Sequence, residues 1–248
     1  ARRGAGYLAL ATALQTPIDL FRCPSDPAPA LNEVFYPRTN GISFESRGIN
    51  SPLATRFELP VSSYAAAHCS QESRNFVSAN MNGTQPTNGT GCDFEDHDGM
   101  FGVWSYLSFR DVTDGLSNTV MIGERAYQRR LANETDESRR FARAGLLYMA
   151  ALCNDGRRMS AALVNGKWGI NVNDVQNNAQ ESLGSTHAGG AQVVLGDGSV
   201  RFLSENINSD PTNGGGTVPT NNPPNSTNRN SILEYLFCRD DGTVLGEF

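Results

Sequence analysis

The chain has 248 residues, which is enough for one large domain or two small ones with a buried core. Its 20 basic and 26 acidic residues give a net charge of −6, which argues against a general nucleic-acid-binding surface because such a surface needs a basic field. No apolar run reaches the ~18 residues of a membrane span, and no signal peptide is visible. The 25 glycines and 12 prolines predict many turns and long loops in a β-rich domain.

The first part of the chain begins with apolar residues at helical spacing. Residues 2–15 therefore read as the end of a helix, which Thr16-Pro17 would stop. We expect a short extended run over residues 18–23 and a strand over residues 62–67.

The middle of the chain alternates short ordered elements with polar segments. Residues 110–117 are typical of a short helical turn, and residues 119–124 of a strand. Residues 126–144 are charged and suit either an exposed helix or a loop with ion pairs. Residues 146–152 are apolar and compatible with a helix, whereas residues 165–178 are rich in turn formers.

A hairpin is the strongest local prediction. Two runs rich in β-formers flank Asp197-Gly198, a dipeptide typical of a two-residue turn. Pairing outward from that turn places three pairs on the core face: Leu195 with Val200, Val193 with Phe202, and Ala191 with Ser204. The opposite face would be mixed, with Gln192, Val194, Arg201 and Leu203.

The C-terminal part is mostly polar. Residues 209–230 are almost entirely Asn, Pro, Gly, Thr and Ser, which predicts a long surface loop. Residues 231–237 form a short helix or strand that returns to the body. A turn at residues 240–242 then leads to a last strand over residues 243–245.

Several blocks occur along the chain in a fixed order. His187 is followed, after nine residues, by Asp197-Gly198, and four further blocks accompany this spacing: residues 23–27, Ser63-Tyr64, residues 114–124 and residues 241–247. In this order the blocks resemble a planctomycete prepilin-like family of unknown function with a His-x(9)-Asp-Gly signature. The resemblance spans residues 23–247.

The resemblance implies a type IV pilin-like or pseudopilin-like α+β fold, in which the remnant of an N-terminal helix packs on an antiparallel sheet with long loop insertions. Residues 1–22 would be the end of that helix and its connector. Residues 23–248 would form the globular domain, with polar insertions at 70–99, 127–184 and 209–230. The residues expected to be structural are His187, Gly189, Gly190, Asp197, Gly198, Asp114, Gly115, Asn118 and Glu124.

The function that the resemblance implies is structural. We expect an exported, pseudopilin-like subunit of a cell-surface or secreted filament or envelope assembly, whose precursor is processed by a prepilin peptidase. Its partners would be further copies or related pilin-like subunits, with no nucleic acid, and it would meet the membrane only through an N-terminal helix absent from these 248 residues. The alternative is a secreted carbohydrate- or solute-binding module, with Trp104, Tyr106 or Trp168 lining a groove.

An enzyme is the third hypothesis, and no catalytic residue is predicted. His187 and Asp197 lie beyond the base and at the tip of the predicted hairpin, roughly 15–20 Å apart at ~3.3 Å per strand residue. They therefore cannot share a proton within one chain unless Gly189-Gly190 folds back sharply. We expect His187 to hydrogen-bond a neighbouring backbone group and Asp197 to serve the turn. Nucleophile-elbow and phosphate-loop motifs are absent from the sequence.

The five cysteines are widely spaced, without a C-x-x-C pair, which argues against a zinc or redox motif. In an exported protein two disulfides and one free thiol are expected, with Cys69–Cys92 as the preferred pair. In a cytosolic protein all five would stay reduced and buried.

Calcium is the one cofactor that the sequence suggests. Asp93, Glu95, Asp96 and Asp98 alternate before Gly99 and offer oxygen ligands, although the EF-hand spacing is absent. A solvated acidic loop is the interpretation we favour. Four sequons in predicted loops are candidate glycosylation sites: Asn82, Asn88, Asn133 and Asn225.

Overall fold

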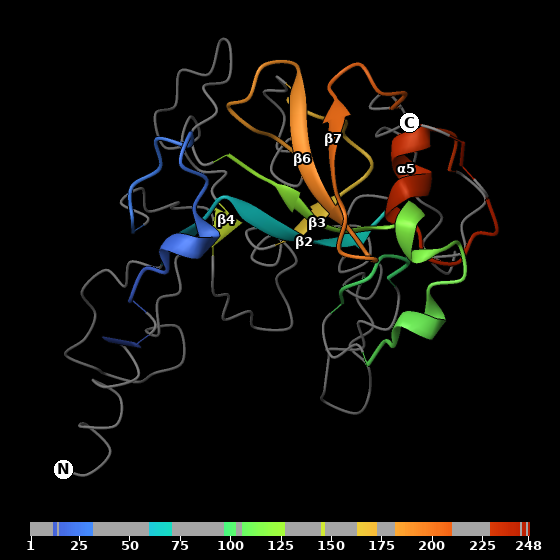
Figure 1. Cartoon of the computed structure of the whole chain (residues 1–248), viewed down its shortest axis with the longest axis horizontal. Helices are drawn as coiled ribbons and strands as arrows, with labels where there is room; N and C mark the ends of the chain where they lie inside the picture. Colours follow the sequence, from blue (N-terminus) through green and yellow to red (C-terminus); the bar gives the residue numbers. More distant parts are fainter. Residues whose placement is uncertain are drawn as a thin grey trace, which may run out of the picture.

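The computed structural model describes residues 12–13, 15–31, 60–70, 97–102, 106–126, 145–146, 163–172, 182–209, 229–243, 245–246 and 248. Within these residues lie a five-stranded sheet, a two-stranded sheet and a short α-helix (Figure 1). The predicted α+β class is confirmed. None of the helices among the described residues is long and apolar enough to cross a membrane.

The larger sheet is mixed rather than antiparallel. Its strand order is β5-β2-β3-β6-β7, and β2 and β5 run parallel whereas the other neighbours are antiparallel. A parallel neighbour requires a long return connection, which the chain between β2 and β5 supplies. The strands are β2 (Tyr64–Cys69), β3 (Val120–Glu124), β5 (Leu163–Asn165), β6 (Gly190–Leu195) and β7 (Val200–Ser204).

The predicted strands over residues 62–67 and 119–124 are confirmed as β2 and β3. A separate short strand, β1 (Val61–Ser62), precedes β2 and pairs with β4 (Gly145–Leu146). The segment predicted as helix-compatible from residue 146 therefore starts in a strand, and its remainder lies outside the described residues. Although β5 falls within the predicted 127–184 insertion, all three of its residues are buried.

Short 3-10 helices replace two of the predicted features. Residues 18–23 are not a continuous extended run, because η1 (Asp19–Phe21) forms a turn between extended flanking residues, with Arg22 N–H donating to the Asp19 carbonyl at 3.0 Å. The predicted helical turn at 110–117 is divided between η4 (Phe109–Asp111) and η5 (Leu116–Asn118).

The helix that packs on the sheet is C-terminal. α5 (Ile232–Phe237) begins at a capping box, in which the Ser231 side chain accepts from the Glu234 N–H and the Glu234 carboxylate accepts from the Ser231 N–H. Leu233, Leu236 and Phe237 are fully buried in the main core with residues of β2, β3, β5, β6 and β7. The predicted N-terminal helix lies outside the described residues except for Thr12, Ala13 and Gln15, of which Thr12 and Ala13 are helical.

In Figure 1, η1 and α5 lie at opposite ends of the large sheet.

The predicted last strand, over residues 243–245, is wrong for its two described residues, because Thr243 and Leu245 lie outside any strand. The Thr243 N–H instead donates to Asp241 Oδ1 at 2.6 Å, which continues the turn.

The β6–β7 hairpin is present, but its predicted register is off by one residue. Val194 lies opposite Val200 and Ala191 opposite Leu203. The Gly198 N–H donates to the Leu195 carbonyl, and Gly198 has a φ of 84°, the pattern of a three-residue loop in which a glycine follows a type I turn.

The register shift changes which residues of β7 reach the core. Ala191, Val193 and Leu195 are buried as predicted, and Leu203 joins them. Phe202 and Val200, predicted to face the core, are 46% and 62% exposed. A shift of one residue exchanges the two faces of a strand because side chains alternate with a period of two.

Candidate functional site

Three side chains from distant parts of the chain meet at one end of β3. Cys23 follows η1, Glu124 is the last residue of β3, and His187 lies in the turn before β6. The His187 Nε2 atom is 3.2 Å from Glu124 Oε1 and 3.6 Å from Cys23 Sγ. The three ligand-type atoms all lie within 4.8 Å of one another.

Glu124 is the buried member of the group. Its Oε2 atom accepts a hydrogen bond of 2.7 Å from the Gln192 N–H of β6, which leaves Oε1 directed at His187. The antiparallel β3–β6 pairing sets this geometry because it holds the end of β3 beside the start of β6. The carboxylate is therefore held in place by the sheet itself.

Cys23 is surrounded by hydroxyl groups. Its Sγ atom is 3.0 Å from Ser25 Oγ, and the Tyr64 side chain lies nearby. Burial, followed by the nearby Cys23 and Glu124 groups, raises the pKa of Tyr64, so the phenol keeps its proton and remains a donor. Tyr64 faces Glu124 across the β2–β3 ladder.

The turn that carries His187 is held by its neighbours. Ser185 Oγ donates to the Gly190 carbonyl at 2.6 Å and accepts from the His187 N–H at 3.0 Å. The Thr186 hydroxyl donates to the Ser25 carbonyl at 3.0 Å, which ties this turn to the segment that contains Cys23. The His187 side chain is 36% exposed, so small solutes can reach the Cys23, Glu124 and His187 side chains from the solvent.

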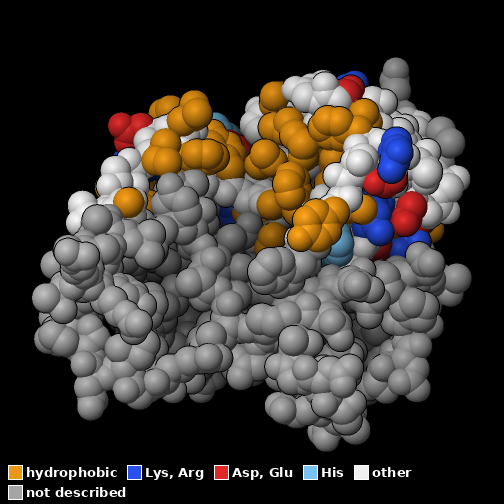
Figure 2. Space-filling model, turned by 90° about the horizontal axis from the view of Figure 1, so that it is seen from below, with side chains coloured by type: hydrophobic (Ala, Val, Ile, Leu, Met, Phe, Trp, Pro, Cys, Tyr) orange, Lys and Arg blue, Asp and Glu red, His pale blue; other side chains and the backbone are white. Residues whose placement is uncertain are grey.

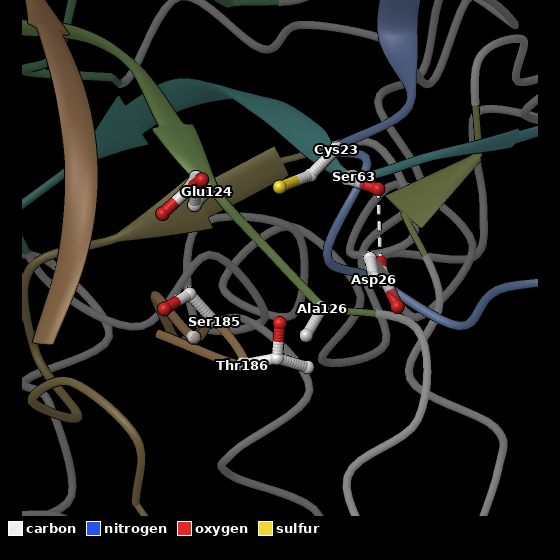
Figure 3. A pocket seen from close by; sticks show the side chains of 8 residues that line it. Cys23, Asp26, Ser63, Glu124, Ala126, Ser185 and Thr186 are labelled. Carbon is white, nitrogen blue, oxygen red and sulfur yellow. Dashed lines mark hydrogen bonds between the residues drawn. The ribbon is translucent and has the colours of Figure 1, made fainter. Parts of the chain in front are cut away.

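A small pocket lies beside these residues, with about 150 Å³ of empty space, part of it open to solvent. Figure 3 shows the Cys23 sulfur directed toward the side of the pocket from which Glu124 projects. The pocket is lined by Cys23, Asp26, Ser63, Glu124, Ala126, Gly184, Ser185 and Thr186.

The arrangement does not suit a proton relay. In a nucleophile–histidine–acid relay the two partners contact different ring nitrogens, so that one nitrogen accepts a proton while the other donates. Here both the thiol and the carboxylate approach Nε2 of His187. The group is instead a convergent set of sulfur, nitrogen and oxygen donors.

The sequence predicts structural roles for His187 and Glu124 but does not predict their contact. The expected backbone partner of the His187 side chain is replaced by two side chains, Glu124 and Cys23. All three residues lie in the ordered blocks noted in the sequence, and that co-occurrence was the available signal.

Asp114 joins two other blocks of the sequence. Its carboxylate accepts from the Asp241 N–H and the Gly242 N–H, each at 2.8 Å. The side chain of Asn118 donates back to the Asp114 carbonyl at 3.2 Å, and Gly115 between them has a φ of 98°. These contacts agree with the structural roles predicted for Asp114, Gly115 and Asn118.

Asp197 serves the hairpin turn, as expected. Its Oδ1 atom accepts from the Ser199 N–H at 2.8 Å, and the pKa of Asp197 is lowered first by the nearby Ser199 side chain and then by this N–H. Gly198 and Gly189 both have a φ of 84°, which favours glycine. Gly190 is required for a different reason: there is no room for a side chain, because a Cβ there would clash with the Leu203 carbonyl of β7.

Of the four predicted calcium ligands, Asp98 alone is described. It is buried, accepts from the Ser70 N–H at 2.8 Å and from the Ser70 hydroxyl, and pairs with Arg229 at 3.0 Å. The Asp98 carboxylate is therefore already paired with the Arg229 guanidinium rather than left open for a cation. The remaining acidic residues of the cluster, Asp93, Glu95 and Asp96, lie outside the described residues, and the calcium site stays a prediction.

Several other predicted residues also lie outside the described part of the chain. These are Cys92, Cys153, Trp104 and the four sequon asparagines, Asn82, Asn88, Asn133 and Asn225. Cys69 is buried at the end of β2 and forms no disulfide in the structure, so its predicted pairing with Cys92 is not observed there. Cys23 and Cys238 are free thiols.

His68 gives the protein an acid-sensitive element. Burial lowers the pKa of His68 below its ordinary 6.5, while its Nδ1 atom lies 2.8 Å from the Phe101 carbonyl. The unfolded chain therefore takes up a proton near pH 6.5 before the folded chain does. Stability present above pH 6.5 falls as the pH decreases from there toward the folded-state pKa, by about 1.4 kcal/mol per pH unit.

We expect a His68→Asn variant, which keeps a donor near the Phe101 carbonyl, to lose this acid-side slope. Urea unfolding between pH 7.5 and 5 measures the free energy for both proteins. Burial raises the pKa of Asp98, which acts in the opposite direction in both of them, so the difference between the two curves isolates His68. Parallel curves would exclude His68 as the cause.

Comparison with known proteins adds a family. A family model described as a protein of unknown function (DUF1559), SBP_bac_10, matches residues 3–210. No curated protein and no solved structure matches the chain. The matched range includes Cys23, Glu124 and His187, so the whole candidate site lies inside it. The chain therefore belongs to the DUF1559 family of proteins of unknown function.

Proposed function

We propose that this protein is a pilin-like structural subunit of an exported filament or envelope assembly. The observation that carries the proposal is the connector, defined as residues 18–26. The Phe21 carbonyl and the Asp26 carboxylate are bound to the globular domain through Ser63, whereas Ile18, Leu20 and Phe21 have exposed side chains.

Two serines at the start of the sheet hold the connector. The Ser63 N–H donates to the Phe21 carbonyl at 2.8 Å, and the Ser63 hydroxyl donates to Asp26 Oδ2 at 2.9 Å. The Ser62 hydroxyl also lies 3.3 Å from the Phe21 carbonyl. Asp26 is itself buried, so the end of the connector is part of the domain.

The connector exposes apolar area that the domain does not use. Leu20 is 83% exposed, and Ile18 and Phe21 are more than one-third exposed. Figure 2 shows hydrophobic side chains gathered in two groups on the described part of one face. Exposed apolar groups on a rigid segment are typical of surfaces that other chains cover. Copies of this chain or related pilin-like subunits are the partners we propose.

A secreted binding module is the second candidate, because one stretch exposes aromatic rings. Tyr106 is 90% exposed, and Phe109 in η4 is also largely exposed. Trp168 does not contribute to such a surface, since it is 2% exposed. Ring stacking on a carbohydrate would then depend on Tyr106 and Phe109.

The test compares two exposed apolar residues in the native host. Leu20→Asp is expected to abolish regular fibres or envelope arrays in electron micrographs, while leaving the melting temperature of the isolated domain within the range of ordinary surface substitutions. Tyr106→Ser is the matched control and should leave assembly intact. Intact mass of the native protein reports whether a prepilin-type N-terminus is present.

A soluble monomer with an ordinary cleaved signal peptide would contradict the proposal. Normal assembly by the Leu20→Asp protein would exclude the connector as the contact surface. Loss of glycan binding by the Tyr106→Ser protein, with no assembly in either case, would favour the binding module.

A further inference from the structure

The convergent group of Cys23, Glu124 and His187 has the composition of a transition-metal site. A thiolate, an imidazole and a carboxylate are the three ligand types that zinc uses in proteins. Each ligand comes from a different segment of the chain. Glu124 is buried, whereas Cys23 and His187 are partly accessible to solvent. An ion can therefore enter from the solvent side.

The two separations that involve His187 also fit. Tetrahedral zinc with bonds of ~2.3 Å to sulfur and ~2.0–2.1 Å to nitrogen and oxygen separates sulfur from nitrogen by ~3.5 Å and nitrogen from oxygen by ~3.4 Å. The observed separations are 3.6 Å from Cys23 Sγ to His187 Nε2 and 3.2 Å from that nitrogen to Glu124 Oε1. Both contacts use the same ring nitrogen, as coordination to one ion requires.

Neighbouring groups orient the three ligands. The Gln192 N–H holds Glu124 Oε2 and leaves the other carboxylate oxygen for a metal. The Ser25 hydroxyl lies 3.0 Å from the Cys23 sulfur, where it can donate to a thiolate. Hydrogen bonds of this kind fix ligand geometry in metal sites.

A second cluster of metal-ligating residues provides a contrast. Asp114, Cys238 and Asp241 also lie close together. Both oxygens of Asp114 are already used by backbone N–H groups, and Asp241 Oδ2 is 3.4 Å from Arg229 Nε. Burial raises the pKa of the Cys238 thiol, which disfavours the thiolate that a metal needs. This cluster therefore has a structural role: it connects Asp114 to the turn at Asp241 and Gly242.

We propose that Cys23, Glu124 and His187 bind one zinc ion, with the fourth position open to the adjacent pocket. Binding replaces the thiol proton of Cys23 by the metal and releases that proton to solvent. The ion joins the connector, the end of β3 and the turn before β6, and so stabilises the attachment of the connector. Zinc binding at this site needs only the isolated chain and does not depend on the proposed assembly.

The test titrates the metal-free protein with Zn²⁺ and, as a spectroscopic probe, with Co²⁺. We expect one zinc per chain, a higher melting temperature with zinc and a thiolate-to-cobalt charge-transfer band. Cys23→Ser should abolish the band, and the matched Cys238→Ser variant should keep it. Ser25→Ala should weaken zinc binding by about tenfold, because it removes a neighbouring donor without removing a ligand.

A measurement on the unaltered protein avoids dependence on how the variants fold. Zinc is expected to slow alkylation of Cys23 at least about tenfold, since a metal-bound thiolate is a poor nucleophile, and a chelator should restore the rate. Peptide mass spectrometry follows each cysteine separately. Equal alkylation of Cys23 with and without zinc, absence of a one-to-one complex, or a cobalt band that survives Cys23→Ser would each overturn the proposal.

Discussion

Replacing Lys167 with methionine is expected to lower the free energy of unfolding by about 3–5 kcal/mol, which is the usual cost of removing one member of a buried ion pair. Lys167 Nζ lies 2.9 Å from Glu234 Oε1, and the side chains of both residues are buried. Methionine keeps most of the apolar stem of lysine, so the loss isolates the charge. Glu234 would be left as a buried carboxylate without its cation.

The same carboxylate explains why the effect should be large. Glu234 Oε2 accepts from the N–H groups of Asn230 and Ser231 at the start of α5. One side chain therefore caps the helix and pairs with the segment after β5. Gly166 permits this approach, since a Cβ there would meet the backbone of Leu233.

The control is the double variant Lys167→Met/Glu234→Gln. It removes both charges and keeps a carbonyl oxygen that can accept from the helix N-terminus, so it should be more stable than Lys167→Met alone. Guanidinium unfolding of the three proteins gives the free energies. If the double variant is no more stable than the single variant, the loss arises from side-chain packing rather than from the unpaired charge.

Local chemistry made much of the large sheet predictable. The strands at residues 62–67 and 119–124 and the β6–β7 hairpin follow from short runs of β-formers and from Asp197-Gly198. The register was not predictable from the dipeptide alone. Two- and three-residue loops share the Asp-Gly signal, and the choice depends on whether Gly196 joins the loop, which the packing of Leu195 and Leu203 in the core decides.

The candidate site was predictable only in part. The blocks that contain Cys23, Glu124 and His187 are visible in the sequence, but their meeting depends on strand order in the sheet. Glu124 is 63 residues from His187 along the chain, and Cys23 is 164 residues from it. Pairings over such separations depend on global topology, which neither periodicity nor turn chemistry reports.

Gly190→Ala is expected to destabilise the protein by about 3 kcal/mol, the upper end of the usual cost of overpacking. A Cβ at this position would meet the carbonyl of Leu203 on the paired strand β7, and the nearest obstacle is backbone rather than a flexible side chain. The β6–β7 ladder would have to separate at Gly190. Because the same strand carries Gln192, whose N–H holds Glu124, the damage should extend to the candidate site.

The neighbouring Gly189 separates steric exclusion from backbone strain. It has a φ of 84°, but a Cβ there would meet nothing within 4 Å, and asparagine tolerates that conformation better than alanine does. Gly189→Asn should therefore cost at most about 1 kcal/mol, while Gly190→Asn should be at least as damaging as Gly190→Ala. Thermal and denaturant unfolding of the three variants measures both effects. Equal losses at the two positions would mean that strain, rather than the close approach of β7, makes Gly190 necessary.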